Sequence, residues 1–126
     1  MQIKVLIADD DMNVQRLMDN VVEINFRDVA IERALSPQSF WKKVSDANAD
    51  APPYNFIFLN VEYIKEEPEG FLERLKTANP NAPDKLILMG SAADVEACGE
   101  DIKKLPLLDK PFSLDKFEEV VKAVHT

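Results

Sequence analysis

Polar side chains that could handle a phosphoryl group occur at three separate places in the chain. Asp9 and Asp10 form an adjacent carboxylate pair, Ser91 supplies a hydroxyl and Lys110 an ammonium group. Paired carboxylates suit a hard divalent cation such as Mg2+, which prefers oxygen ligands. A hydroxyl and an ammonium group that converge suit an anion, most simply a phosphoryl group. Together these residue types predict a metal-assisted phosphoryl site, provided that the fold brings them together.

Each of these features has a simpler explanation when it is taken alone. Adjacent aspartates often form an acidic loop that leads into a helix, because carboxylates suit the helix N-terminus. A serine after a strand is commonly a turn residue, and a lysine before a proline is commonly solvated. The prediction therefore depends on whether all of these residues follow the strands of one sheet.

Residues 56–59 (Phe-Ile-Phe-Leu) predict the central strand of that sheet. A short unbroken apolar run is typical of a strand buried on both faces, as in the middle of a parallel sheet. Asn60 and Glu62 follow it directly. In open α/β sheets, ligands bind just beyond the carboxyl ends of the strands. We therefore expect these two residues at the ligand-binding edge.

Four more strands are expected, over residues 4–8, 28–34, 85–89 and 105–108, with 28–34 shorter and at an edge. Asp9 and Asp10 follow the first of them, Ser91 follows the strand over 85–89, and Lys110 follows the last. All the candidate residues are thus expected at the carboxyl ends of strands.

Helices are expected between these strands and after the last one. Apolar residues recur at helical spacing over 14–22, with Asp11 or Asn13 as the N-cap, and Ser36 with Pro37 begins a second helix. Further helices are expected from residue 71, over 94–104 and after Ser113, and a charged loop is expected over 63–70. Alternating strands and helices predict an α/β fold with a parallel sheet covered on both faces, as one domain over residues 1–126.

Composition limits the classes of partner. The formal net charge is −8, which argues against nucleic acid or an anionic membrane as a partner, because both need a basic surface. The excess of acidic residues is explained by solubility, by binding of a basic partner surface or by binding of a cation. Cys98 is the single cysteine and is interpreted as a packing residue, and Trp41 as a core residue rather than a ligand-stacking one. We found no signal peptide and no membrane span, so a cytoplasmic protein is expected.

With these residues in these positions, the chain resembles the receiver domains of two-component response regulators over essentially its whole length. The matching stretches are residues 5–10 (Val-Leu-Ile-Ala-Asp-Asp), 55–60 (Asn-Phe-Ile-Phe-Leu-Asn), 88–92 (Leu-Met-Gly-Ser-Ala) and 109–112 (Asp-Lys-Pro-Phe). The resemblance implies a flavodoxin-like, doubly wound (βα)5 three-layer sandwich with the strand order 2-1-3-4-5. It also implies signal transduction, in which a histidine kinase passes a phosphoryl group to an aspartate at the end of strand three.

The resemblance also assigns roles to individual residues. Asp9 and Asp10 resemble the Mg2+-binding acids, and the backbone carbonyl of Glu62 would be a further metal ligand. Ser91 resembles the hydroxyl residue that binds the phosphoryl group and moves on switching, and Lys110 resembles the lysine that pairs with a phosphoryl oxygen. Asn60 occupies the position of the phospho-acceptor.

Asn60 is the main departure from the family pattern. An aspartyl phosphate needs a carboxylate nucleophile, and a carboxamide is neutral and a poor nucleophile. The substitution also removes one formal negative charge, so Mg2+ binding is expected to weaken, with Asn60 offering only its carbonyl oxygen. In addition, Leu107 stands where the family often has a switching aromatic residue. Tyr63 and Ile64 stand where the family usually has a Met-Pro pair, and the loop that contains them is longer than in the family. The difference reflects either sequence drift at the surface or an altered contact near the site.

Three hypotheses follow. The first is a non-enzymatic, atypical receiver domain that is not phosphorylated and acts as a protein-interaction module. Its partners would be a histidine kinase or another signalling protein, and an output domain or effector at the face made by helix four, strand five and helix five. The second is a conventional receiver in which Asn60 is an engineered substitution of aspartate. The third, a small enzyme or nucleotide-binding domain, lacks a glycine-rich phosphate loop, since the chain has three glycines.

Overall fold

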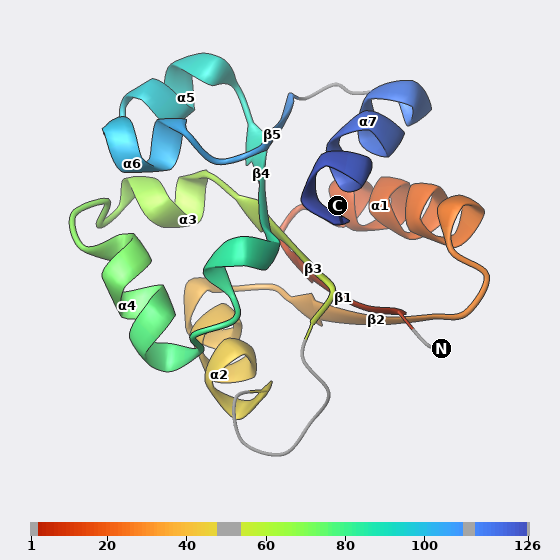
Figure 1. Ribbon diagram of the computed structural model, residues 1–126, viewed down its shortest axis with the longest axis horizontal. Coiled ribbons are helices and arrows are strands. Elements are labelled where there is room, and N and C mark those ends of the chain that lie inside the picture. The colour runs from red at the N-terminus through yellow and green to blue at the C-terminus, as the bar shows by residue number, and fades with distance from the viewer. Residues whose placement is uncertain (1–2, 48–53, 110–112, 126) are drawn as a thin grey trace.

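Five parallel strands form one sheet in the order β2-β1-β3-β4-β5 (Figure 1). The computed structural model describes residues 3–47, 54–109 and 113–125. The strands are β1 (Ile3–Ala8), β2 (Val29–Ala34), β3 (Phe56–Asn60), β4 (Leu86–Gly90) and β5 (Leu107–Asp109). The predicted flavodoxin-like α/β fold, its strand order and the edge position of β2 are all confirmed. The prediction that β2 is shorter than the other strands is wrong, since it has six residues, as β1 does.

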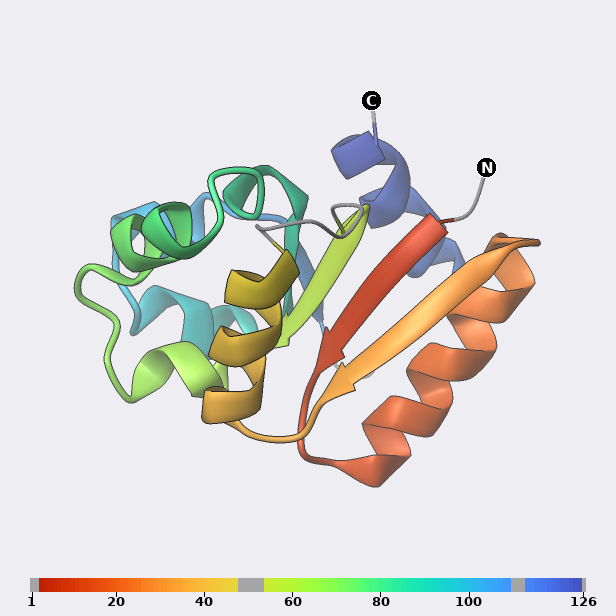
Figure 2. The ribbon, with the colours of Figure 1, turned by 90° about the horizontal axis from the view of Figure 1, so that it is seen from below.

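Helices cover both faces of the sheet (Figures 1 and 2). One face carries α1 (Met12–Asn25) and α7 (Leu114–His125). The other carries α2 (Pro37–Ala47), α3 (Glu62–Lys65), α4 (Phe71–Ala78), α5 (Ala92–Glu96) and α6 (Glu100–Lys103). A short 3-10 helix, η1 (Pro83–Lys85), leads into β4. No helix in the described ranges is long and apolar enough to cross a membrane.

The central strand divides the core into two apolar clusters, because successive side chains of a strand point to opposite faces. Phe56 and Phe58 pack with α1 and α7, and the ring centroids of Phe58 and Phe117 lie 5.5 Å apart. Ile57 and Leu59 pack with the helices of the opposite face. Burial on both faces explains why the sequence shows an unbroken apolar run at this strand.

The helix starts follow the predicted capping residues. The side chain of Asp11 accepts a hydrogen bond from the backbone N–H of Asn13 at 2.8 Å and caps α1. The hydroxyl oxygen of Ser36 accepts from the N–H of Ser39 at 3.1 Å, with Pro37 as the first residue of α2. Each cap satisfies a backbone donor that has no partner inside its helix.

The helix predicted over residues 94–104 is wrong as a single element. It splits into α5 and α6, because Gly99 adopts φ +104°, a conformation that side-chain-bearing residues rarely reach. Cys98 lies in the turn between these two helices; it is buried, as its interpretation as a packing residue predicts, and its thiol donates to the Asp94 carbonyl at 3.4 Å. Burial raises the pKa of the Cys98 thiol, which keeps it protonated at neutral pH.

Two other boundaries differ from the prediction. The segment after Glu62, expected as a loop, contains the helical turn α3, which is anchored by the fully buried Ile64. The last strand begins at Leu107 rather than at residue 105, because Pro106 has no N–H for the sheet and contributes only its carbonyl, which accepts from the Leu88 N–H at 2.9 Å.

Candidate functional site

The sheet brings most of the candidate residues to one edge. Ala8 pairs with Leu59, and Asn60 pairs with Met89. Because β1, β3 and β4 are parallel neighbours, the residues at and just beyond their carboxyl ends gather at the same edge (Figure 2). We call this group the strand-end site; its described members are Asp9, Asp10, Asn60, Glu62 and Ser91. Lys110, the remaining predicted member, lies outside the described residues.

Asp9 is held firmly in place. It is fully buried, and its Oδ1 accepts a hydrogen bond from the Asp11 N–H at 2.9 Å. Its backbone is fixed at both ends, since its N–H donates to the Ala34 carbonyl at 3.0 Å and its carbonyl accepts from Gln15 Nε2 at 2.8 Å. Asp10, in contrast, is exposed. The acidic pair therefore combines one immobilised carboxylate with one that faces solvent.

Gln15 is a supporting residue that the sequence reasoning missed. It is 1% exposed, and its Nε2 also donates to the Ile7 carbonyl at 3.1 Å, so one side chain ties α1 to the end of β1. Its Oε1 has no hydrogen-bond partner among the described atoms. The available signal was its spacing, because Gln15 precedes the buried Met18 and Val22 by three and seven positions on the helix.

Asn60 ends the central strand with its amide engaged locally. Its Oδ1 accepts a hydrogen bond from the backbone N–H of Glu62 at 3.0 Å. This contact turns the chain from β3 into α3, as Asn and Asp side chains often do after a strand. An Asp side chain offers the same acceptor atom, so the local turn does not require the amide.

Ser91 is committed to the start of the next helix. It is the N-cap of α5, and its hydroxyl oxygen accepts from the Asp94 N–H at 3.2 Å while the hydroxyl donates to Asp94 Oδ2 at 2.9 Å. Lys65 reaches the other oxygen, with its Nζ 3.0 Å from Asp94 Oδ1. The hydrogen bond from Lys65, followed by that from Ser91, holds the pKa of Asp94 below its usual range. The segments after β3 and β4 are therefore linked through Asp94.

Gly90 shows how closely these two segments approach each other. A Cβ built on Gly90 would lie 2.4 Å from Cγ1 of Val61, a side chain that is itself fully buried. The backbone just before Ser91 thus packs directly on the residue that follows Asn60. This contact fixes Ser91 relative to the end of β3.

Tyr63 is a second residue whose place the sequence did not reveal. Its hydroxyl is buried and has no hydrogen-bond partner among the described atoms. Burial, together with the negative charges of Asp10 and Asp9, raises the pKa of Tyr63 to about 12. Tyr63 therefore lies close enough to the acidic pair for the two carboxylates to disfavour its ionisation.

The donor atoms of this site are all oxygens. Carboxylates of Asp9 and Asp10, the amide oxygen of Asn60 and the backbone carbonyl of Glu62 are the ligand types that Mg2+ prefers. Within the described ranges, no cluster of three or more His, Cys, Asp or Glu side chains is placed to hold a metal ion. The donor set fits Mg2+ in chemical type, and its side chains carry two formal negative charges, those of Asp9 and Asp10.

Comparisons with known proteins identify the fold. No protein-family model and no curated protein sequence matches the chain. Among solved structures, the signal receiver domain of a two-component response regulator from Bacteroides fragilis superposes with a TM-score of 0.69 at 19% identity, covering 100% of this chain and 98% of that one. The Vibrio cholerae chemotaxis protein CheY4 gives 0.69 at 14% identity, with 98% and 99% of the chains covered.

A third similar structure contains ligands. A response regulator from Burkholderia pseudomallei, described with a phosphorylated aspartic acid, a calcium ion and citrate, has a TM-score of 0.66 and 15% identity, covering 94% of this chain and 66% of that one. At these levels of identity the likeness establishes a common fold.

Proposed function

We propose that this chain is an atypical receiver domain of two-component signalling that is not phosphorylated at position 60 and acts through protein contacts. Asn60 is the observation that carries the proposal. It stands at the carboxyl end of the central strand, beside the acid-bearing end of β1 and the serine-bearing end of β4. An acidic pair and a serine, the residue types expected around a phospho-acceptor, thus lie beside a position that carries an amide and not a nucleophilic carboxylate.

Several features support the wider receiver interpretation. The strand order is 2-1-3-4-5, the acidic pair follows β1, and Ser91 follows β4. The similar solved structures include proteins described as response regulators and as a chemotaxis protein. Each of them is less than 25% identical to this chain, so the assignment of function depends on the residues of the strand-end site.

A divalent cation has a defined place in this proposal. Asp9 and Asp10 would supply carboxylate oxygens to Mg2+, and Asn60 and the Glu62 carbonyl would supply neutral oxygens. The cation would neutralise the two adjacent carboxylates and hold an anion at the same edge of the sheet. Because Asn60 carries no charge, we propose weaker Mg2+ binding than an aspartate at this position would give.

The proposed contact face for an output domain or effector is made by α5, α6, β5 and α7. Leu114, at the start of α7, is 37% exposed on the described surface. A histidine kinase or another signalling protein would be the second partner. In this function the chain performs no catalysis of its own.

The proposal is tested by incubating the protein with a small-molecule phosphodonor and Mg2+ and measuring its intact mass. We expect no acid-labile gain of phosphate, because an amide at position 60 does not attack phosphorus. A stable, acid-labile phosphate that maps to the strand-end site would refute the proposal.

A further inference from the structure

Two hollows lie side by side on the face of the molecule formed by α2, α3, α4 and α6. One has a volume of about 630 Å3 and is lined in part by Trp41, Tyr63 and Arg74. The other, of about 600 Å3, lies between the start of α4 and the segment from the turn at Cys98 into α6. Residues 69–71 line both, so the two hollows share a wall. We refer to them together as the paired hollows.

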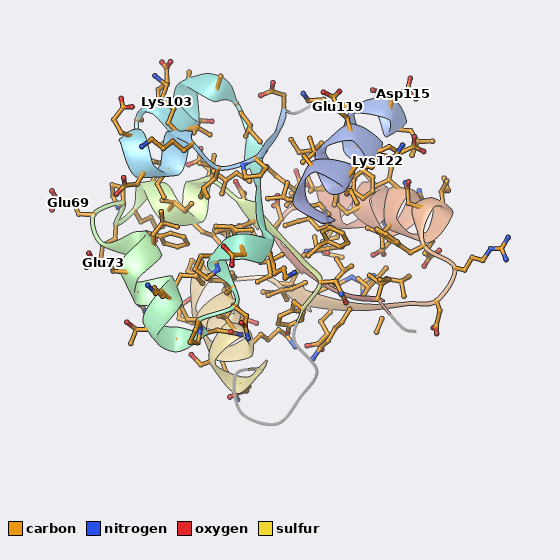
Figure 3. All side chains as sticks on the ribbon, viewed as in Figure 1. Glu69, Glu73, Lys103, Asp115, Glu119 and Lys122 are labelled. Carbon is orange, nitrogen blue, oxygen red and sulfur yellow. The ribbon has the colours of Figure 1, made fainter. Side chains whose placement is uncertain are left out.

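Acidic side chains outnumber basic ones by six to one in the described lining of the paired hollows. The acidic residues that line them are Glu66, Glu67, Glu69, Glu73, Glu100 and Asp101. None of these six forms an ion pair with a described residue. Figure 3 shows Glu69 and Glu73 projecting outward at the edge of the molecule. Like charges gathered on one surface repel one another, and a partner of opposite charge relieves that repulsion.

Aromatic side chains also line the paired hollows: Phe71 lines both, and Trp41 lines the larger one. Trp41 is partly buried, and its ring lies 5.4 Å from that of Phe71, which is 5% exposed. Arg74 is the single basic residue in the described lining, and its guanidinium already lies over the Trp41 ring at 3.9 Å. Apolar floors bordered by carboxylates suit arginine and lysine, whose aliphatic stems pack on apolar surface while their charged ends reach the border.

We propose that the paired hollows bind an arginine- and lysine-rich segment of a partner protein. Carboxylates pair with guanidinium groups through two parallel hydrogen bonds, which gives both charge and shape complementarity. Nucleic acid and anionic membranes would be repelled by the same charges. In the part of the chain that the structure describes, no three acidic side chains are placed to share one metal ion.

This docking surface is separate from the function proposed for the strand-end site. The paired hollows and the strand-end site have no residue in common. Tyr63 lines one of the hollows, and the charges of Asp9 and Asp10 raise its pKa. Binding of a basic segment therefore does not depend on whether position 60 accepts phosphate. An experiment on this surface gives its answer even if the proposed function fails.

The test uses a synthetic nine-residue peptide of alternating arginine and lysine, and the fluorescence of Trp41, which is the only tryptophan in the chain. We expect a saturable change in Trp41 fluorescence with this peptide and none with a peptide of alternating glutamate and glycine. Two double variants with the same change in net charge distinguish binding of the peptide at the paired hollows from its general attraction to an acidic protein. Glu69→Gln/Glu73→Gln alters the paired hollows, and Asp115→Asn/Glu119→Gln alters the outer surface of α7 (Figure 3).

We expect the first variant to bind the basic peptide about tenfold more weakly than the wild-type protein, and the α7 variant to bind it within about twofold of wild type. Equal losses in both variants would overturn the proposal, because they would show general charge attraction. The same signal produced by Mg2+ or Ca2+ alone, or by raising the protein concentration without peptide, would also overturn it in favour of a cation or a second copy of the chain.

Discussion

Asn60 and Tyr63 distinguish the strand-end site from the rest of this edge of the sheet. Asn60 places a neutral amide at the end of the central strand, and Tyr63 places a buried hydroxyl near two carboxylates. The amide at position 60 is readable from the sequence alone. The role of Tyr63 is not, because it depends on how α3 packs against the loop after β1.

The unpartnered hydroxyl of Tyr63 gives a prediction about stability. A buried donor without a partner is costly, so Tyr63→Phe should leave the free energy of unfolding unchanged or raise it by up to about 1 kcal/mol. Tyr54→Phe is the matched control, because the Tyr54 hydroxyl donates to Glu32 Oε1 at 3.0 Å and its loss should destabilise by about 1 kcal/mol. Urea denaturation of both variants measures the difference, and a larger loss for Tyr63→Phe than for Tyr54→Phe would contradict this account.

At the scale of elements, the sequence predicted every strand and most helix starts. Asp11, Ser36 and Ser113 cap helices as expected, because capping is a local property of a side chain and the next three residues. Two of the misses lie where distant contacts decide. The turn α3 forms because Ile64 is buried in the core, and Gln15 binds the end of β1 across the β1–α1 loop. Helical spacing indicates that Gln15 is buried, but it does not reveal either of these contacts.

The break between α5 and α6 depends on the backbone of Gly99. Its Cβ position is open, with nothing within 4 Å, so a substitution there is opposed by backbone conformation and not by a clash. We expect Gly99→Ala to lower the free energy of unfolding by about 1–3 kcal/mol, since φ +104° is strained for alanine. Thermal or urea unfolding checks this. Unchanged stability with a continuous helix over 92–103, seen by NMR chemical shifts, would contradict it.

Glu32 links β1, β2 and α2 and makes part of the stability depend on pH. Its carboxylate lies 3.3 Å from both Lys4 Nζ and Lys43 Nζ and accepts from the Tyr54 hydroxyl. Burial opposes ionisation, but hydrogen bonds from Tyr54 and Lys43 and the charge of Lys4 outweigh it and lower the pKa of Glu32 below 4.5. The contribution to stability is therefore complete above the unfolded-state pKa and is lost as the pH falls through the folded-state pKa.

We accordingly expect Glu32→Gln to cost stability near pH 7 and to cost progressively less as the pH falls below about 4.5. Because 35% of the Glu32 side chain is exposed to solvent, which screens its ion pairs, the difference at pH 7 should stay within the range of surface ion pairs, about 0.2–1 kcal/mol. Urea denaturation of both proteins from pH 3 to 7 measures it. A difference that does not change with pH would show that packing, and not charge, is responsible.

At the scale of the whole molecule, two different surfaces are candidates for binding. Its carboxyl edge gathers the acidic pair, Asn60 and Ser91, and the helices of one face form the paired hollows. The topology and the residues at the strand ends were predictable, since both follow from alternating elements and short apolar runs. The paired hollows were not, because their lining comes from α2, the α3–α4 loop, α4 and α6, which are far apart in sequence.

The central claim is our proposal that Asn60 occupies the position of a phospho-acceptor, beside an acidic pair and a serine, and that the strand-end site therefore lacks a nucleophile. The most direct measurement is the intact mass of the wild-type, Asn60→Asp and Asn60→Ala proteins after treatment with a small-molecule phosphodonor and Mg2+. We predict that Asn60→Asp alone gains one acid-labile phosphoryl group, which peptide mapping places at position 60. Labelling of the wild-type or Asn60→Ala protein at this site, or an Asn60→Asp protein that folds and stays unlabelled, would contradict the claim.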